Sequence, residues 1–106
     1  MRILLDECVD ERFRHEFLGH DCQTARFARL TGLKNGQLLA AAEAQEFDVL
    51  ITVDQAMPYQ QDMMSRRIAV LVLCAPTNRI QDLRKLTALV QESLVTVQPG
   101  QMIRLS

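Results

Sequence analysis

Val49-Leu50-Ile51-Thr52-Val53-Asp54 is the stretch of sequence that decides the fold. Its apolar, mainly β-branched residues are typical of a strand that is covered on both faces. Ile3-Leu4-Leu5, near the start of the chain, has the same character and runs into Asp6-Glu7. Strands buried on both faces belong mostly to parallel sheets with helices packed on each side. We therefore predict an α/β domain with a mainly parallel sheet.

Helical segments are expected between the strands, which supports helices on both faces of the sheet. Further strands are expected over residues 22–25 and 68–74. Four helix starts are predicted from capping residues or proline: Asp10, Asn35, Pro58 and Asn78. The helix from Pro58 should reach towards Met64, and the helix from Asn78 should continue to Leu94. Residues 95–105 should form either a small hairpin or a terminal sheet strand.

Composition limits the classes of function. The chain has 106 residues, of which 48% are hydrophobic, so residues 1–106 should form one compact domain with its own core. A net charge of −1 gives no global attraction to nucleic acid. Three scattered cysteines are typical of a reducing compartment. Since no apolar run approaches the roughly 20 residues of a membrane span, and an early acid interrupts any signal peptide, we expect a cytoplasmic protein with no membrane partner.

Carboxylates follow two of the predicted strands at the point where each strand ends. Asp6 and Glu7 follow the first strand, and Asp54 follows the strand over 49–53. Parallel neighbours joined by right-handed crossovers bring these acids to one edge of the sheet, where open α/β sheets bind ligands. Clustered carboxylates repel one another unless a cation lies between them, and a hard divalent cation suits oxygen ligands. The competing reading is that Asp54 only caps the turn before Pro58.

A stretch without acids lies between Asp21 and Glu43 and carries three basic residues: Arg26, Arg29 and Lys34. Such a stretch can face phosphate groups, although it can equally be an ordinary solvated loop. The adjoining Leu33-Lys34-Asn35-Gly36-Gln37-Leu38-Leu39 also has two readings. It is either a capped helix start or a third wall of the acidic site, with polar groups and helix N–H donors facing a ligand.

Several of these motifs together resemble a known family. Ile3-Leu4-Leu5-Asp6-Glu7, the segment 33–39 and Leu50-Ile51-Thr52-Val53-Asp54-Gln55 look like a small bacterial PIN-like family, relatives of the PIN ribonuclease domain. Pro58-Tyr59-Gln60-Gln61 and Gln98-Pro99-Gly100 also resemble that family, so the likeness covers nearly the whole chain. Its members are often described as toxins of toxin–antitoxin pairs.

The resemblance implies a Rossmann-like PIN-like domain that acts as an endoribonuclease with Mg²⁺ or Mn²⁺ as cofactor. The first acid of the PIN pattern falls on Asp6, with Glu7 beside it. The T-x-D acid falls on Asp54, and these three carboxylates are the expected catalytic and metal-binding residues. Substrate contacts are expected from six further residues: Thr52, Asn35, Gln37, Arg26, Arg29 and Lys34. The expected partners are RNA, an antitoxin protein and a second copy of the chain.

One position departs from the family pattern. Gln37 stands where relatives commonly carry Glu, and a glutamine has no negative charge and cannot act as a base. Asp62 is a candidate for a further acid on the short helix. With an uncharged Gln37 on this side of the acidic site, we expect either a weak, one-metal nuclease or a PIN-like protein that binds a protein partner without cleaving RNA.

A third hypothesis, that the chain is a receiver-like domain which accepts a phosphoryl group on an aspartate, ranks below the other two. Receiver domains also place an acidic pair after their first strand and an aspartate after their third. They then require a Ser or Thr after the fourth strand and a lysine after the last. Here Cys74-Ala75-Pro76-Thr77 follows the fourth strand, and no lysine comes after Lys85.

Overall fold

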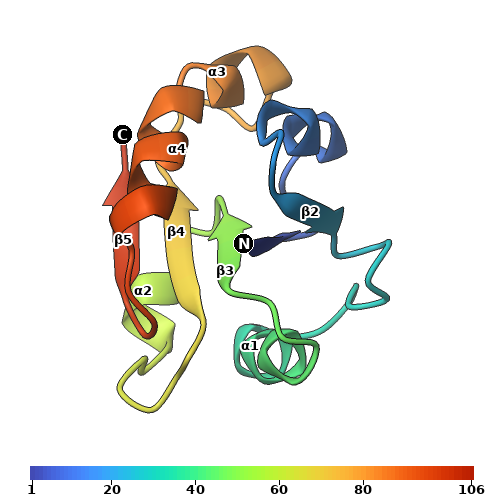
Figure 1. The fold of residues 1–106 in the computed structure, drawn as a ribbon, viewed down its shortest axis with the longest axis vertical. Coiled ribbons are helices and arrows are strands. Elements are labelled where there is room, and N and C mark those ends of the chain that lie inside the picture. The colour runs from blue at the N-terminus through green and yellow to red at the C-terminus, as the bar shows by residue number, and fades with distance from the viewer.

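A five-stranded sheet forms the centre of the molecule (Figure 1). The computed structural model describes residues 1–106, except for the side chain of Gln60. All neighbouring strands pair in parallel, in the order β2-β1-β3-β4-β5. The strands are β1 (Arg2–Leu5), β2 (Asp21–Thr24), β3 (Val49–Thr52), β4 (Ala69–Leu73) and β5 (Met102–Leu105). The prediction of one compact α/β domain with a parallel sheet is confirmed, and the architecture is Rossmann-like.

Helices cover both faces of the sheet, as predicted. The 3₁₀ helix η1 (Glu11–Glu16) and the helices α3 (Ile80–Arg84) and α4 (Thr87–Thr96) pack on one face. The opposite face carries α1 (Asn35–Ala44) and α2 (Met57–Gln60). In β1, Ile3 and Leu5 point to the first face and Leu4 to the second, because side chains alternate along a strand. The result is two apolar cores separated by the sheet.

The last crossover differs in hand from the other three. The connection from β1 to β2 runs through η1 on the first face of the sheet. The connections from β2 to β3 and from β3 to β4 run in the opposite direction along the sheet, through α1 and α2 on the second face. These three connections therefore share one hand. The connection from β4 to β5 moves in the same direction as that from β3 to β4, but α3 and α4 lie on the face of η1 (Figure 1). Crossovers between parallel strands nearly always have the same hand, and the β4–β5 connection departs from that rule.

Two predicted helices are shorter than expected. The helix expected from Asn78 to Leu94 is interrupted at residues 85–86, between α3 and α4. Asn78 does not cap α3, which begins at Ile80 after Arg79 without a side-chain cap; its amide instead donates to the carbonyl of Cys8. The helix at Pro58 ends at Gln60 and does not reach Met64.

The closing segment is a sheet strand rather than a hairpin. β5 lies parallel to β4, with Leu71 opposite Ile103, while residues 95–96 belong to the end of α4. The turn into β5 contains Gly100 at φ 82°, and a Cβ there would lie 2.9 Å from the carbonyl oxygen of Arg66. Glycine is therefore required at this position. Among the described helices, none combines the length and apolar character that a membrane crossing needs.

Candidate functional site

Two aspartates lie at the carboxyl ends of adjacent central strands. Asp6 follows β1 directly, and its backbone N–H donates to the carbonyl of Ile51 in β3 at 2.9 Å. Asp54 follows β3 after one intervening residue. The chain leaves β1 towards β2 on one side and places β3 on the other. Such a switch point opens a crevice at the carboxyl ends of the strands, where ligands bind in open α/β sheets.

Thr52 holds the two aspartates together. Its side chain is completely buried, and its Oγ1 donates to Asp6 Oδ2 at 2.7 Å and accepts the backbone N–H of Asp54 at 3.1 Å. Asp6 is itself buried, with 9% of its surface exposed, and its Oδ1 accepts the N–H of Glu7 at 2.8 Å. The Asp6 carboxylate is therefore fixed in one orientation by two donors.

Asp54 is also held by two donors. Its Oδ1 accepts the N–H of Ala56 at 3.0 Å, and its Oδ2 accepts Nδ2 of Asn35 at 3.0 Å. The first contact is the local turn that the competing reading of Asp54 anticipated. The second contact comes from the first residue of α1, the helix that packs on the face of the sheet opposite η1. Asn35 was expected to be the N-cap of α1, but the cap residue is Lys34, and Asn35 orients an acid instead.

The donor set fits a hard cation. Each carboxylate oxygen of Asp6 and Asp54 accepts one hydrogen bond, which leaves about half of the four acceptor sites of each carboxylate. No ion pair joins Asp6, Glu7 or Asp54 to a basic side chain in the described part of the chain. Mg²⁺ is often held by one or two carboxylates together with waters and substrate phosphates. Asp6 and Asp54 therefore have the chemistry to hold one such ion.

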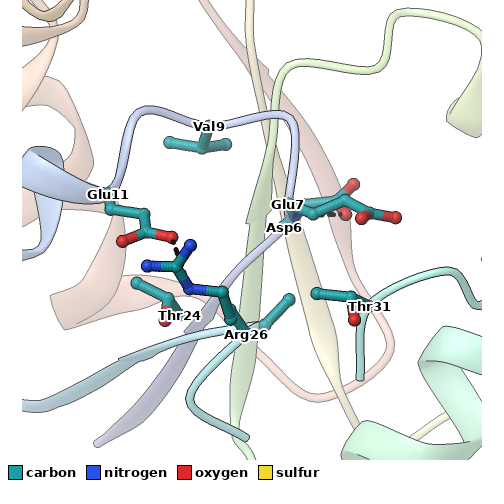
Figure 2. A pocket seen from close by; sticks show the side chains of 8 residues that line it. Asp6, Glu7, Val9, Glu11, Thr24, Arg26 and Thr31 are labelled. Carbon is teal, nitrogen blue, oxygen red and sulfur yellow. Dashed lines mark hydrogen bonds and ion pairs between the residues drawn. The ribbon is translucent and has the colours of Figure 1, made fainter. Parts of the chain in front are cut away.

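Glu7 lies beside Asp6 but is turned towards a loop. Its Oε1 accepts the N–H of Gly32 at 3.1 Å, and it is one of the residues that line the hollow drawn in Figure 2. The described residues contain no group of three or more His, Cys, Asp or Glu side chains arranged to hold a metal ion. As folded here, the site thus offers two anchored carboxylates and a third that is tied elsewhere.

A cavity of about 200 Å³ opens beside Asp6 and Glu7 (Figure 2). Its opposite wall carries Arg26, whose Nε lies 3.5 Å from Glu11 Oε1. The remaining polar lining comes from Thr24 and Thr31. Arg26 thus shares this cavity with Asp6 and Glu7, whereas Asp54 does not line it. Glu11, Thr24 and Thr31 were not anticipated, because they reach the cavity from η1, β2 and a loop whose packing has no local sequence signal.

Three of the expected substrate contacts do not touch the acids. Arg29, Lys34 and Gln37 are exposed, and no hydrogen bond or ion pair links them to Asp6 or Asp54 within the described residues. Asp62 is exposed and accepts the N–H of Met64 at 2.9 Å. It lies beyond the end of α2 rather than on that short helix, and no hydrogen bond or ion pair joins it to Asp6 or Asp54 among the described residues.

A cysteine borders the site without adding charge. Cys8 Sγ lies 3.6 Å from Thr52 Oγ1. Burial raises the pKa of the Cys8 thiol, and the nearby charge of Asp6 acts in the same direction. The thiol therefore stays neutral at physiological pH, and the charge of the site comes from its carboxylates.

No protein-family model, curated protein or solved structure matches this chain.

Proposed function

We propose that the protein is a metal-dependent ribonuclease of PIN-like type, in which Asp6 and Asp54 hold one Mg²⁺ or Mn²⁺. The observation that carries the proposal is the Thr52 bridge, which anchors two carboxylates lacking ion pairs at the carboxyl ends of adjacent strands. Burying a carboxylate without a cation is costly, so this arrangement is better explained by a ligand than by stability.

The residues around the acids have separate roles in this proposal. When bound, the ion supplies positive charge that polarises the phosphodiester and promotes ionisation of the attacking water. Thr52 fixes the orientation of Asp6, and Asn35 fixes that of Asp54. Glu7 is the most exposed of the three carboxylates and is suited to orient the water or accept its proton. Arg26, across the cavity, contacts the RNA backbone.

The test is cleavage of single-stranded RNA in the presence of Mg²⁺ or Mn²⁺. Asp6→Asn and Asp54→Asn keep the size of each side chain but remove its charge, and each should reduce cleavage at least about 100-fold because charge stabilisation in the transition state is lost. Chelation with EDTA should abolish the activity of the unmodified protein.

Asp21→Asn is the matched control. Asp21 lies at the opposite edge of the sheet, at the start of β2, where it pairs with Arg2 at 2.7 Å. This variant should cleave as the unmodified protein does. Equal cleavage by all four proteins would identify a contaminant and would contradict the proposal.

A second candidate is a PIN-like protein that acts through a protein partner, such as an antitoxin, without cleaving RNA. The absence of a three-carboxylate group among the described residues favours it. Under this reading, millimolar Mg²⁺ or Mn²⁺ leaves the melting temperature unchanged, since a ligand that does not bind the folded state cannot stabilise it. The toxin of a toxin–antitoxin pair is compatible with either candidate.

For the receiver-like alternative, the strand order is favourable and the position of the Thr77 hydroxyl is unfavourable. The strand order β2-β1-β3-β4-β5 is that of receiver-type folds. However, Thr77 after β4 donates its hydroxyl to Asp82 in α3, where a receiver would direct it to the phosphoacceptor. Labelling of Asp54 by acetyl phosphate would support this alternative.

A further inference from the structure

A second hollow continues from the first. It has a volume of about 200 Å³ and is lined by Glu11, Arg14, Thr24, Arg26 and Phe27. Glu11, Thr24 and Arg26 also line the hollow beside Asp6 and Glu7. The two hollows therefore adjoin on either side of the Arg26–Glu11 pair, and we call them together the 26–27 groove.

The turn that forms the wall of this groove is firmly anchored. Ala25 and Leu30 are buried at its two ends, and the N–H of Leu30 donates to the carbonyl of Ala25 at 2.8 Å. The Oγ1 of Thr24 accepts the N–H of Phe27 at 3.1 Å. Arg29 within the turn has φ 62°, a left-handed conformation that costs a non-glycine residue energy. The backbone that carries Phe27 is thus fixed by tertiary contacts.

Phe27 points into water from this anchored turn. Its side chain is 75% exposed, although a buried phenylalanine would contribute favourably to folding. Arg26 beside it is also mostly exposed, and its 3.5 Å pair with Glu11 is a surface ion pair of low strength. An exposed aromatic ring next to a cation that is easily released is the combination that binds a nucleic-acid base and its phosphate.

In the half of the groove that contains Phe27, two arginines face one acid, Glu11, whereas Asp6 and Glu7 line the other half. Arg14 is one of these arginines, and Arg29 lies two residues beyond Phe27. Neither forms an ion pair with a described residue. A single aromatic ring among arginines and threonines is not the contiguous apolar patch that marks a protein–protein interface.

We propose that the 26–27 groove binds a short segment of single-stranded RNA, with one base stacked on Phe27 and the adjoining phosphates beside Arg26 and Arg14. This inference rests on the proposed function, because the same strand then passes from Phe27 to the hollow at Asp6. It adds a base-stacking residue and a direction to the substrate path. A base in a duplex is already stacked and cannot reach the ring, so the groove selects single strands.

The test is a binding titration of fluorescently labelled oligouridine with the full chain in EDTA, so that metal-dependent cleavage does not interfere. Phe27→Ala should raise the dissociation constant at least about fivefold, and Phe27→Trp should restore binding, because stacking needs a ring. Tyr59→Ala is the matched control. Tyr59 is 81% exposed but contacts Arg104 of β5, at the opposite edge of the sheet.

An abasic oligonucleotide of the same length separates stacking from other effects. Phe27→Ala should not weaken its binding, since there is no base to lose. Oligouridine binding that is unchanged by Phe27→Ala, or an equal loss for the abasic strand, overturns the groove assignment. Cleavage that still depends on Asp6 then leaves the proposed function standing. Conversely, Phe27-dependent binding without any cleavage supports the groove and removes the nuclease.

Discussion

At the scale of single residues, Thr52 is the position on which the site depends. One hydroxyl serves two acids: it donates to the carboxylate of Asp6 and accepts the N–H of Asp54. Sequence alone places Thr52 and Asp54 on the same side of the strand, since alternate residues share a face. It cannot show that the hydroxyl turns to Asp6, because that choice depends on the register between β1 and β3.

Thr52→Val tests this bridge. Valine keeps the shape of threonine but leaves the buried Asp6 Oδ2 and the Asp54 N–H without their partner. We expect a loss of about 1–3 kcal/mol in the free energy of unfolding, measured by urea denaturation. RNA cleavage should fall about ten- to 100-fold as the carboxylates lose their alignment.

Thr52→Ser is the control for the same prediction. Serine keeps the hydroxyl and loses only a buried methyl group, at a cost of about 1 kcal/mol. It should therefore lose stability yet retain most of its activity. Equal activity of the serine and valine variants would mean that the hydroxyl does not position the acids.

Asn35 shows where prediction from sequence stops at this scale. The position of a helix start near residue 35 is correct, because asparagine and glycine precede an apolar face. The predicted role of the Asn35 side chain as a helix cap is wrong, since its amide contacts Asp54 and Lys34 is the cap residue of α1. A capping residue and a residue that orients a ligand have the same sequence signature, and tertiary packing decides between them.

At the scale of secondary-structure elements, Glu43 connects α1 to the segment that leads into β4. Its Oε1 accepts Nη1 of Arg66 at 2.8 Å, and its Oε2 accepts the N–H of Arg67 at 2.6 Å. Burial opposes ionisation of Glu43, but the hydrogen bonds from Arg67 and Arg66 outweigh it and hold the pKa below its ordinary value of 4.5. The ionised form is thus the one that stabilises the fold.

Glu43→Gln should lower the free energy of unfolding at neutral pH by about 1–3 kcal/mol, because the charge-assisted bonds weaken. A lowered pKa in the folded state gives a contribution that is present above about pH 4.5 and lost as the pH falls through the folded value. The difference between variant and unmodified protein should therefore shrink in acid.

Denaturation curves at several pH values measure this effect. Glu92→Gln is the control, because Glu92 is an exposed residue of α4 and its change should stay within about 0.5 kcal/mol at every pH. A pH-independent difference for Glu43→Gln would show that its charge does not contribute.

At the scale of the whole molecule, the sheet was predictable and its last connection was not. The apolar strands β1, β3 and β4 have a clear pattern, and their parallel pairing follows from the helices between them. The opposite hand of the β4–β5 connection is set by the packing of α3 and α4 against η1 on one face. Because β4 is apolar on both of its faces, no local sequence pattern shows on which face of the sheet α3 and α4 will pack.

The same limit applies to the site. Strand ends place Asp6 and Asp54 together, and this follows from topology. The 26–27 groove depends on how η1 and the turn after β2 approach each other, which residues distant in sequence determine. The acid-free stretch was a visible signal for it, but it indicated only charge and not the exposed ring of Phe27.

The most direct test of the central claim is a titration of Mn²⁺ into the protein, followed by the electron paramagnetic resonance signal of free Mn²⁺. Asp6 and Asp54 should bind about one ion per chain, so the unmodified protein and Asp21→Asn should both deplete the free signal. The Asp6→Asn/Asp54→Asn double variant should leave it undiminished. The same depletion by the double variant and the unmodified protein would contradict the assignment of the metal site.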